Sequence, residues 1–434
     1  MLAPVVRRAP ARAPGPAVLV QSRDEARFVN RAAIVFAGLI VLRAVLTDPL
    51  LNSVINYSGE GGTLIEKIHP ATYGMLILLV VTLTRVRIVL TRVEVRLIRP
   101  LFIFIGVIAL LVVMMQVLGR SVSIGYLLET YIAGFLIAFF MFVFPLEKRR
   151  MIGTTILAYI LVNAVLAILE KVAGQRLLPY PYLELSFRPT ALTSHPLVIG
   201  LINSGAVVFV LATRWRPALK GLALMIIIMG TFAAGARTGA IIASLASLAA
   251  LSLTEMPGRS AAERLRWRAI LFGSLLFAAP LLLIVADQAG FLERFYGGYI
   301  DENAQARIDV YKVFDWVSWG DILIGRDIVE VKKMVMDRLG ILVESSVVVF
   351  VFQFGLFGAL AFAGMLLWSL LRLAAGADPR AYIAVLAFLA VAMSNDSLSG
   401  KHWYITMMLV LMIAFRNDSP DAFGRFPRRH WGQA

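Results

Sequence analysis

The sequence predicts an all-α integral membrane protein with about twelve transmembrane helices and a large, partly helical loop on the outer side of the membrane. Hydrophobic residues make up 59% of the 434 residues, and charged residues only 16%. A soluble domain has about 45 to 50% apolar and about 25% charged residues. The mean hydropathy of +0.81 also indicates that lipid is the main solvent of this chain.

Apolar runs suited to crossing a membrane recur along the chain. The expected spans are residues 31–47, 69–84, 100–118, 126–146, 151–170, 195–213, 219–235, 238–254, 269–287, 346–371, 381–394 and 401–415. The last two are shorter than the roughly 20 residues that a crossing helix needs. We therefore expect the turn between them, NDSLSGKHWY, to lie below the membrane surface, shielded by protein or lining a polar cavity.

The basic residues predict the orientation of the chain. There are 42 Lys and Arg against 27 Asp and Glu, a formal charge of +15. Most of them fall in cytoplasmic segments when the N-terminus is placed inside, as the positive-inside rule favours. The expected organisation is a disordered basic cytoplasmic tail over 1–30, a transmembrane domain over 31–415 and a second cytoplasmic tail over 416–434.

Composition also excludes several classes of partner and site. The basic residues lie in short loops between apolar runs, without an RNA-binding or zinc-finger pattern, so no nucleic acid is expected as a partner. Cysteine is absent, which excludes disulfides, thiolate metal sites and cysteine nucleophiles.

Two expected outer loops, residues 171–194 and 288–344, are large enough to hold a site. Near the end of the second, Ile328, Val331 and Val335 recur at helical spacing on the side opposite Lys332 and Arg338. This pattern predicts an amphipathic helix that lies on the outer face of the membrane.

Arg237 lies in the short turn of an otherwise apolar hairpin, GTFAAGARTGAIIASL. It could be an arginine that reaches the membrane surface while Gly235 and Gly239 form a G-x-x-x-G helix contact. It could also present its planar guanidinium to a phosphate or pyrophosphate. The two interpretations are compatible.

Arg188 and His195 lie seven residues apart in RPTALTSHP, and His195 begins an expected span. Arg and His in a loop usually carry no special role. Ionisable groups at the edge of a membrane span tend to be functional or paired, which makes both of them candidate binding residues.

The second loop contains Arg307, followed by Asp309, Tyr311 and Trp316 on a predicted helix. The aromatic rings could form an interfacial belt, or they could stack on sugar rings. Glu344 closes this loop just before the next span, where a carboxylate can have its pKa raised enough to act as a base. In the last turn, Asp396, Lys401 and His402 form a further polar group, which could equally be an ordinary solvated loop.

These residues, in this order, resemble the O-antigen ligase and polymerase superfamily of membrane glycosyltransferases. The resemblance covers roughly residues 150–360. It consists of the stretch from Arg188 to Pro196, the GARTG turn, Arg307 with Tyr311 at the opening of a large loop, and Glu344 before a span that contains Gly355 and Gly358.

The resemblance implies about twelve helices, a bacterial inner membrane, a site that faces the periplasm, and neither metal nor cofactor. It implies that Arg237 and Arg307 engage an undecaprenyl-pyrophosphate-linked glycan, with an acceptor glycan, membrane lipids and a chain-length regulator as further partners. Glu344 would then be the catalytic base, and Arg188, His195, Asp309, Tyr311, Trp316 and His402 would line the substrate path.

The expected function is a polymerase of O-antigen, capsule or exopolysaccharide. The ligases carry a His where this chain has Glu344, a departure that favours a polymerase over a ligase acting on lipid A core. A flippase or transporter of lipid-linked oligosaccharides is the non-enzymatic alternative. It would show inverted repeats and ionisable residues at the membrane midplane, whereas here the ionisable residues gather on one side.

Overall fold

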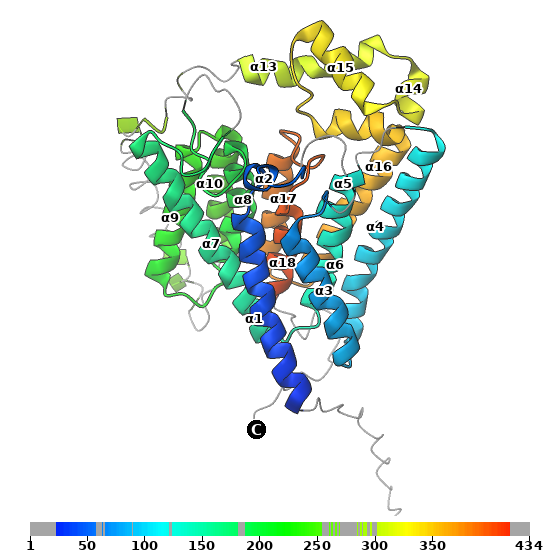
Figure 1. Cartoon of the computed structure of the whole chain (residues 1–434). Coiled ribbons are helices and arrows are strands. Elements are labelled where there is room, and N and C mark those ends of the chain that lie inside the picture. Colours follow the sequence, from blue (N-terminus) through cyan, green and yellow to red (C-terminus); the bar gives the residue numbers. More distant parts are fainter. Residues whose placement is uncertain are drawn as a thin grey trace, which may run out of the picture.

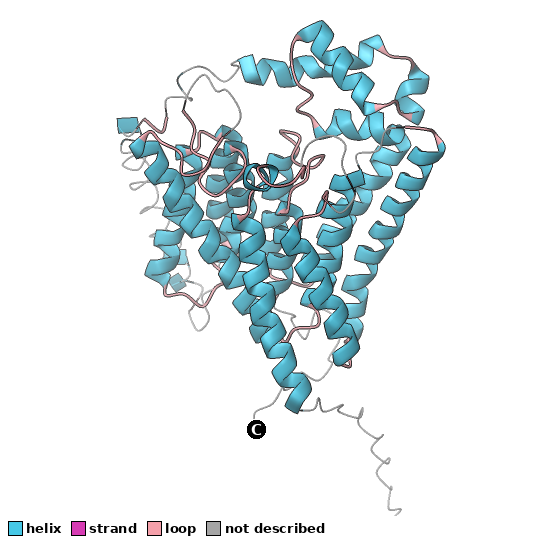
Figure 2. Ribbon diagram, in the orientation of Figure 1, coloured by secondary structure: helices cyan, strands magenta, loops and turns pink. Residues whose placement is uncertain are grey.

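The computed structural model describes residues 23–57, 63, 66–88, 90–120, 124–180, 187–253 and 302–416, with isolated residues between 260 and 296. All the regular structure in these residues is helical (Figures 1 and 2). The elements are α1 (Arg23–Val45), α2 (Asp48–Asn52), α3 (Pro70–Arg85), α4 (Arg92–Val117), α5 (Ile124–Tyr126), the π-helix η1 (Leu127–Ala133), α6 (Gly134–Met141), α7 (Leu146–Ala173), α8 (Pro196–Val210), α9 (Pro217–Ala233), α10 (Arg237–Ser252), α13 (Glu302–Asp309), the 3-10 helix η2 (Val310–Trp316), α14 (Trp319–Ile324), α15 (Ile328–Leu339), α16 (Ser346–Ala374), α17 (Arg380–Ala392) and α18 (Tyr404–Ala414).

Five of the described helices are long and apolar enough to cross a membrane: α1, α4, α7, α16 and the continuous helix Ile124–Met141. The helices α3, α8, α9, α10, α17 and α18 are apolar but shorter. The expected span 269–287 lies outside the described residues apart from isolated positions, and the other expected spans each fall on one of these helices. Helix length alone therefore supports five crossings and leaves the number twelve a prediction.

Local signals in the sequence set where several helices begin. Pro70, Pro196 and Pro217 each occupy the first turn of a helix, where the missing N–H costs nothing. The expected tails 1–30 and 416–434 lie mostly outside the described residues, but α1 begins at Arg23, within the first of them, and has acidic residues in its first turn, where they stabilise a helix.

Small residues bring the helices of the bundle close together. The Cα of Gly200 in α8 lies so near Gly239 in α10 that a Cβ added to Gly239 would be 2.5 Å from it. The prediction of a G-x-x-x-G helix contact is therefore confirmed for Gly239 and wrong for Gly235. Gly239 makes a helix contact, but Gly235 has a φ of 63° and forms the turn before α10 instead. At the centre of the bundle α18 is buried on every side, which explains why it is hydrophobic all round.

One end of the bundle carries α2 and a group of helices formed by α13, η2, α14 and α15 (Figure 1). We call this end the loop end and the group the outer module. The outer module packs on the first part of α16 around its own apolar core, made of Val310, Val313, Ile328, Val331, Val335, Val343, Val348, Val349 and Phe352. The amphipathic helix expected near 328–339 is confirmed as α15, but its apolar face contacts protein rather than lipid.

A break in α16 joins the outer module to the bundle. Gly355 has φ 74° and ψ 163°, so the helix changes direction there. The end of α14 fits into the break, where the backbone N–H of Arg326 donates to the carbonyl of Phe352 at 2.6 Å. Arg120, just after α4, donates to the carbonyl of Ile324 at 2.7 Å. The first part of α16 therefore lies across the loop end beneath the outer module, and only the part after Gly355 descends along α4 (Figure 1).

The break at Gly355 gives a direct test. Gly355→Ala should destabilise the protein by about 2 kcal/mol or more. An alanine at this position would have to keep the positive φ, and its Cβ would collide with the backbone of Leu323 and Ile324. Thermal unfolding in detergent measures the effect. Gly364→Ala is the matched control, since a Cβ on this glycine of the same helix meets nothing within 4 Å. Equal unfolding temperatures for the two variants would show that the break is not strained.

Candidate functional site

Three loops that are distant in sequence meet at the loop end of the bundle. They are residues 187–195 before α8, residues 340–345 before α16, and residues 393–403 between α17 and α18. A small cavity is lined by residues 192–194 of the first loop and 401–403 of the third. Hydrogen bonds join Ser346, at the start of α16, to the carbonyl of Asn395 at 3.0 Å and to the N–H of Leu398 at 3.1 Å.

The first loop is fixed on α7 through its backbone. The N–H groups of Thr190 and Ala191 donate to the carboxylate of Glu170, and the N–H of Leu192 donates to Asn163 at 2.9 Å. Both acceptors are buried residues of α7. The loop is therefore held rigidly even though it forms no regular structure.

Arg188 lies beside the turn that leads into α10. Its Nε donates to the carbonyl of Ala234 at 3.4 Å, and its own carbonyl accepts a hydrogen bond from Arg176 at 3.0 Å. Arg237 is the first residue of α10, three positions after Ala234. The structure thus brings Arg188 to the same turn as Arg237, which the sequence alone did not indicate.

His195 caps the N-terminus of α8, with its Nδ1 accepting the N–H of Leu197 at 3.2 Å. The ring lies in a crowded and positively charged place, which lowers the pKa of His195 to about 3. Burial is the largest cause, followed by the charges of Arg188, His402 and Arg307. At neutral pH the ring is neutral, and the positive charge around it comes mainly from the arginines.

Arg307 and Glu344, which are 37 positions apart in the sequence, approach each other at the loop end. Nη2 of Arg307 lies 3.8 Å from Oε2 of Glu344, and the side chains are 30% and 48% exposed. Among the described residues, the buried Nε of Arg307 has no hydrogen-bond partner. The guanidinium therefore makes one long ion pair and keeps a buried donor for another group.

Other expected site residues of the second loop belong to the outer module. The hydroxyl of Tyr311 lies 3.1 Å from Oγ of Ser345, the residue after Glu344. The ring of Trp316 is covered by the guanidinium of Arg338 at 4.9 Å. Asp309, the last residue of α13, pairs with Lys312 of η2 at 2.8 Å. Only Tyr311 of these three is shown beside the Arg307–Glu344 pair.

The third loop is held by the π-helix η1. Oγ1 of Thr130 donates to the carbonyl of Gly400 at 2.9 Å and accepts the N–H of His402 at 2.9 Å. Asn395 and Trp403 are buried, as expected for a turn shielded by protein. Asp396 reaches solvent, yet its pKa is raised, first because the packed loops limit its hydration and second because Glu344 is negative.

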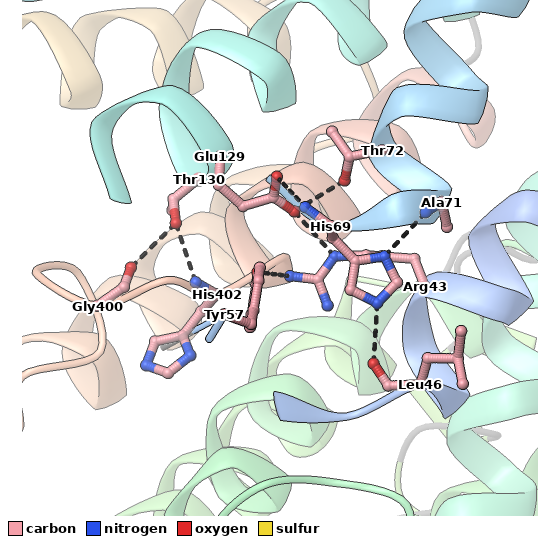
Figure 3. A network of polar contacts seen from close by, with 10 residues as sticks. All are labelled: Arg43, Leu46, Tyr57, His69, Ala71, Thr72, Glu129, Thr130, Gly400 and His402. Carbon is pink, nitrogen blue, oxygen red and sulfur yellow. Dashed lines mark hydrogen bonds and ion pairs between the residues drawn. The ribbon is translucent and has the colours of Figure 1, made fainter. Parts of the chain in front are cut away.

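A buried polar network lies beneath these loops, and the sequence reasoning missed it (Figure 3). Nε of Arg43 donates to Oε1 of Glu129 at 3.0 Å, and both side chains are almost fully buried. The same carboxylate accepts from Thr72 at 2.8 Å and from the N–H of His69 at 3.1 Å, and Arg43 also donates to Tyr57 at 3.1 Å. Arg43 and Glu129 each stand alone in an apolar run, a signal that opposite charges pair within the membrane.

The loop end therefore concentrates positive charge beside two carboxylates. Arg176, Arg188 and Arg307 all act on His195 through their charge, while Asp396 lies in the field of Glu344, Lys332 and Arg307. Such a group of arginines suits a ligand with several negative oxygens, because each guanidinium can form paired hydrogen bonds. Within the described residues no group of three or more His, Cys, Asp or Glu could hold a metal ion.

Comparisons of the chain with protein-family models, with curated proteins and with solved structures give no match.

The low pKa of His195 predicts an acid-dependent loss of stability. Since folding lowers the pKa from 6.5 to about 3, the unfolded chain binds the proton more tightly. The contribution of His195 to the free energy of unfolding is fully present above about pH 6.5 and is lost as the pH falls towards 3. His195→Asn keeps an acceptor that can cap α8 and removes the titrating ring. Unfolding temperatures between about pH 7 and pH 4 should fall less steeply for the variant than for the wild type. Parallel curves would contradict the lowered pKa.

Proposed function

We propose that the chain is a polysaccharide polymerase of a bacterial inner membrane. It transfers glycan from an undecaprenyl-pyrophosphate-linked donor to an acceptor glycan at the loop end, which faces the periplasm. Twelve crossings and two cytoplasmic termini are part of this proposal. The observation that carries it is the gathering of Arg188 and Arg307 around His195, beside Glu344.

The donor pyrophosphate is the group that these arginines suit. The buried Nε of Arg307 is a preformed donor, and the charge of its guanidinium is only partly balanced by Glu344 at 3.8 Å. Arg188 lies next to the turn of Arg237, so these two could bind different oxygens of one pyrophosphate. Preorganised donors of this kind stabilise charge that develops in a transition state.

The reaction we propose is a single displacement at the anomeric carbon. Glu344 takes the proton of an acceptor hydroxyl while the hydroxyl oxygen forms a bond to the anomeric carbon of the donor sugar. The bond from that carbon to the pyrophosphate oxygen breaks, and undecaprenyl pyrophosphate leaves with the electron pair. Arg237 and Arg307 stabilise its negative charge, and His195, neutral at pH 7, lines the path without adding charge.

The outer module would contact the sugars. Tyr311 is 43% exposed and lies beside Ser345, so its ring can stack on a sugar next to Glu344. Trp316 is covered on one side by Arg338, and Asp309 is held by Lys312. Tyr311 is therefore the best candidate for a sugar contact among the expected residues of this loop.

Arg307→Lys tests the pyrophosphate contact. Lysine keeps the charge but loses the planar fork and the Nε donor, so we expect polymer synthesis from purified lipid-linked donor to fall on the order of 100-fold. Arg338→Lys is the matched control, because a lysine can keep the contact with the Trp316 ring and should retain activity. Polymer synthesis near the wild-type rate in Arg307→Lys would remove Arg307 from the site.

Glu344→Gln tests the proposed base. Glutamine keeps the size of the side chain but cannot accept the proton, so turnover should fall on the order of 100-fold while the donor still binds. Single-turnover rates and donor affinity, measured separately in nanodiscs, distinguish these effects. Weaker donor binding with unchanged turnover would make Glu344 a residue that orients Arg307 instead of the base.

A further inference from the structure

The loop that carries Arg188 and His195 contains an unusual backbone position. Ala191 has a φ of 46°, and it is the sole residue other than glycine with positive φ in the described part of the chain. Its side chain is fully buried in a small apolar cluster with Ala167, Ile199 and Ala234. A left-handed alanine costs about 1 kcal/mol or more and persists only where its surroundings enforce it.

The carboxylate of Glu170, near the end of α7, holds Ala191 in this left-handed conformation. Oε2 accepts the N–H of Thr190 at 2.9 Å and the N–H of Ala191 at 2.8 Å, and Oε1 accepts the N–H of Leu177 at 2.6 Å. Two successive N–H groups that point the same way form a concave site for an anion. Here the anion is part of the chain itself, and the side chain is only 5% exposed.

The same face of α7 holds the next residue of the loop. Asn163 accepts the N–H of Leu192 at 2.9 Å, and the hydroxyl of Tyr159 donates to the carbonyl of Leu192 at 3.2 Å. Tyr159, Asn163 and Glu170 lie four and seven residues apart, so they project from one side of the helix. Three consecutive loop residues, from Thr190 to Leu192, are thus fixed by α7, a helix that carries none of the arginines of the site.

Two features argue against a chemical role for Glu170 itself. Its oxygens already accept three backbone hydrogen bonds, and it is too buried to meet a sugar hydroxyl. Its position is more informative, because Arg188 precedes Thr190 by two residues and His195 follows Leu192 by three. A change in the backbone between them would move both side chains.

We propose that Glu170 is a positioning residue, which fixes the left-handed turn at Ala191 and thereby sets where Arg188 and His195 meet the pyrophosphate of the donor. This inference rests on the proposed function. Glutamine at this position would keep the length of the side chain. Its NH₂ group would replace one of the two carboxylate oxygens, and this group cannot accept a hydrogen bond from the backbone N–H that it would face. At least one of the three hydrogen bonds would be lost, together with the negative charge that strengthens the others.

The experiment compares wild type, Glu170→Gln and the matched control Glu147→Gln, an exposed carboxylate in the first turn of the same helix. Hydrogen exchange reports on the amides of Thr190, Ala191 and Leu192, and titration with undecaprenyl pyrophosphate in nanodiscs reports on binding. We expect Glu170→Gln to speed exchange at these amides at least about tenfold and to weaken binding about tenfold, and we expect Glu147→Gln to change neither.

A double-mutant cycle separates positioning from a general loss of stability. If Glu170 acts through Arg188, the Glu170→Gln change should have little further effect on binding in an Arg188→Ala background. Glu170→Asp keeps the charge on a shorter side chain, so its affinity for undecaprenyl pyrophosphate should lie between those of the wild type and Glu170→Gln. This variant takes the place of Glu170→Gln in the experiment if Glu170→Gln does not fold.

The outcomes distinguish the two proposals. Wild-type binding of undecaprenyl pyrophosphate with the same affinity in Glu170→Gln, or equal losses with and without Arg188, would overturn the positioning role alone. Unchanged amide exchange would overturn it as well. A wild-type protein that does not bind undecaprenyl pyrophosphate would overturn the proposed function and this inference together.

Discussion

The ion pair between Arg43 and Glu129 organises the loop end of the bundle. Two charges with almost no exposure are stable only when they face each other and have their remaining hydrogen bonds filled. Thr72, His69 and Tyr57 supply those bonds, and they bring α3 and the segment after α2 to the same place. Because Glu129 belongs to η1, the pair also fixes the π-helix whose next residues hold the loop 393–403.

A common physical constraint explains how the irregular loops are held. Backbone polar groups near an apolar bundle must find partners within the protein. Buried side chains of the helices meet this requirement: Glu170 and Asn163 for the loop before α8, and Thr130 for the loop before α18. At the outer module the partner is backbone, where the break at Gly355 exposes the carbonyl of Phe352 to Arg326. The candidate site is thus assembled by groups that do not belong to it.

The sequence predicted the helices better than it predicted their partners. Apolar runs located the long helices of the bundle, and the loop with Arg307 and Glu344 was identified as one unit. The sequence did not reveal that α15 packs on Val310 and Phe352 rather than on lipid, because an amphipathic pattern shows which face is apolar but not what covers it. Glu170 was missed for a related reason. A carboxylate near the end of an apolar helix looks like an ordinary surface residue until the backbone it captures is known. The break at Gly355 depends on contacts with Leu323 and Ile324 that no local pattern contains.

The candidate site also draws its residues from two parts of the fold, which meet near the break in α16. Arg307 lies in the outer module and Glu344 in the loop between α15 and α16, whereas Arg188 and His195 lie in the loop before α8, which α7 holds in place. The two parts are tied together, because Ser346 bonds to the loop 393–403 and Arg120 bonds to the carbonyl of Ile324. The distance between the two arginines on opposite sides of the site is therefore set by contacts that involve neither of them.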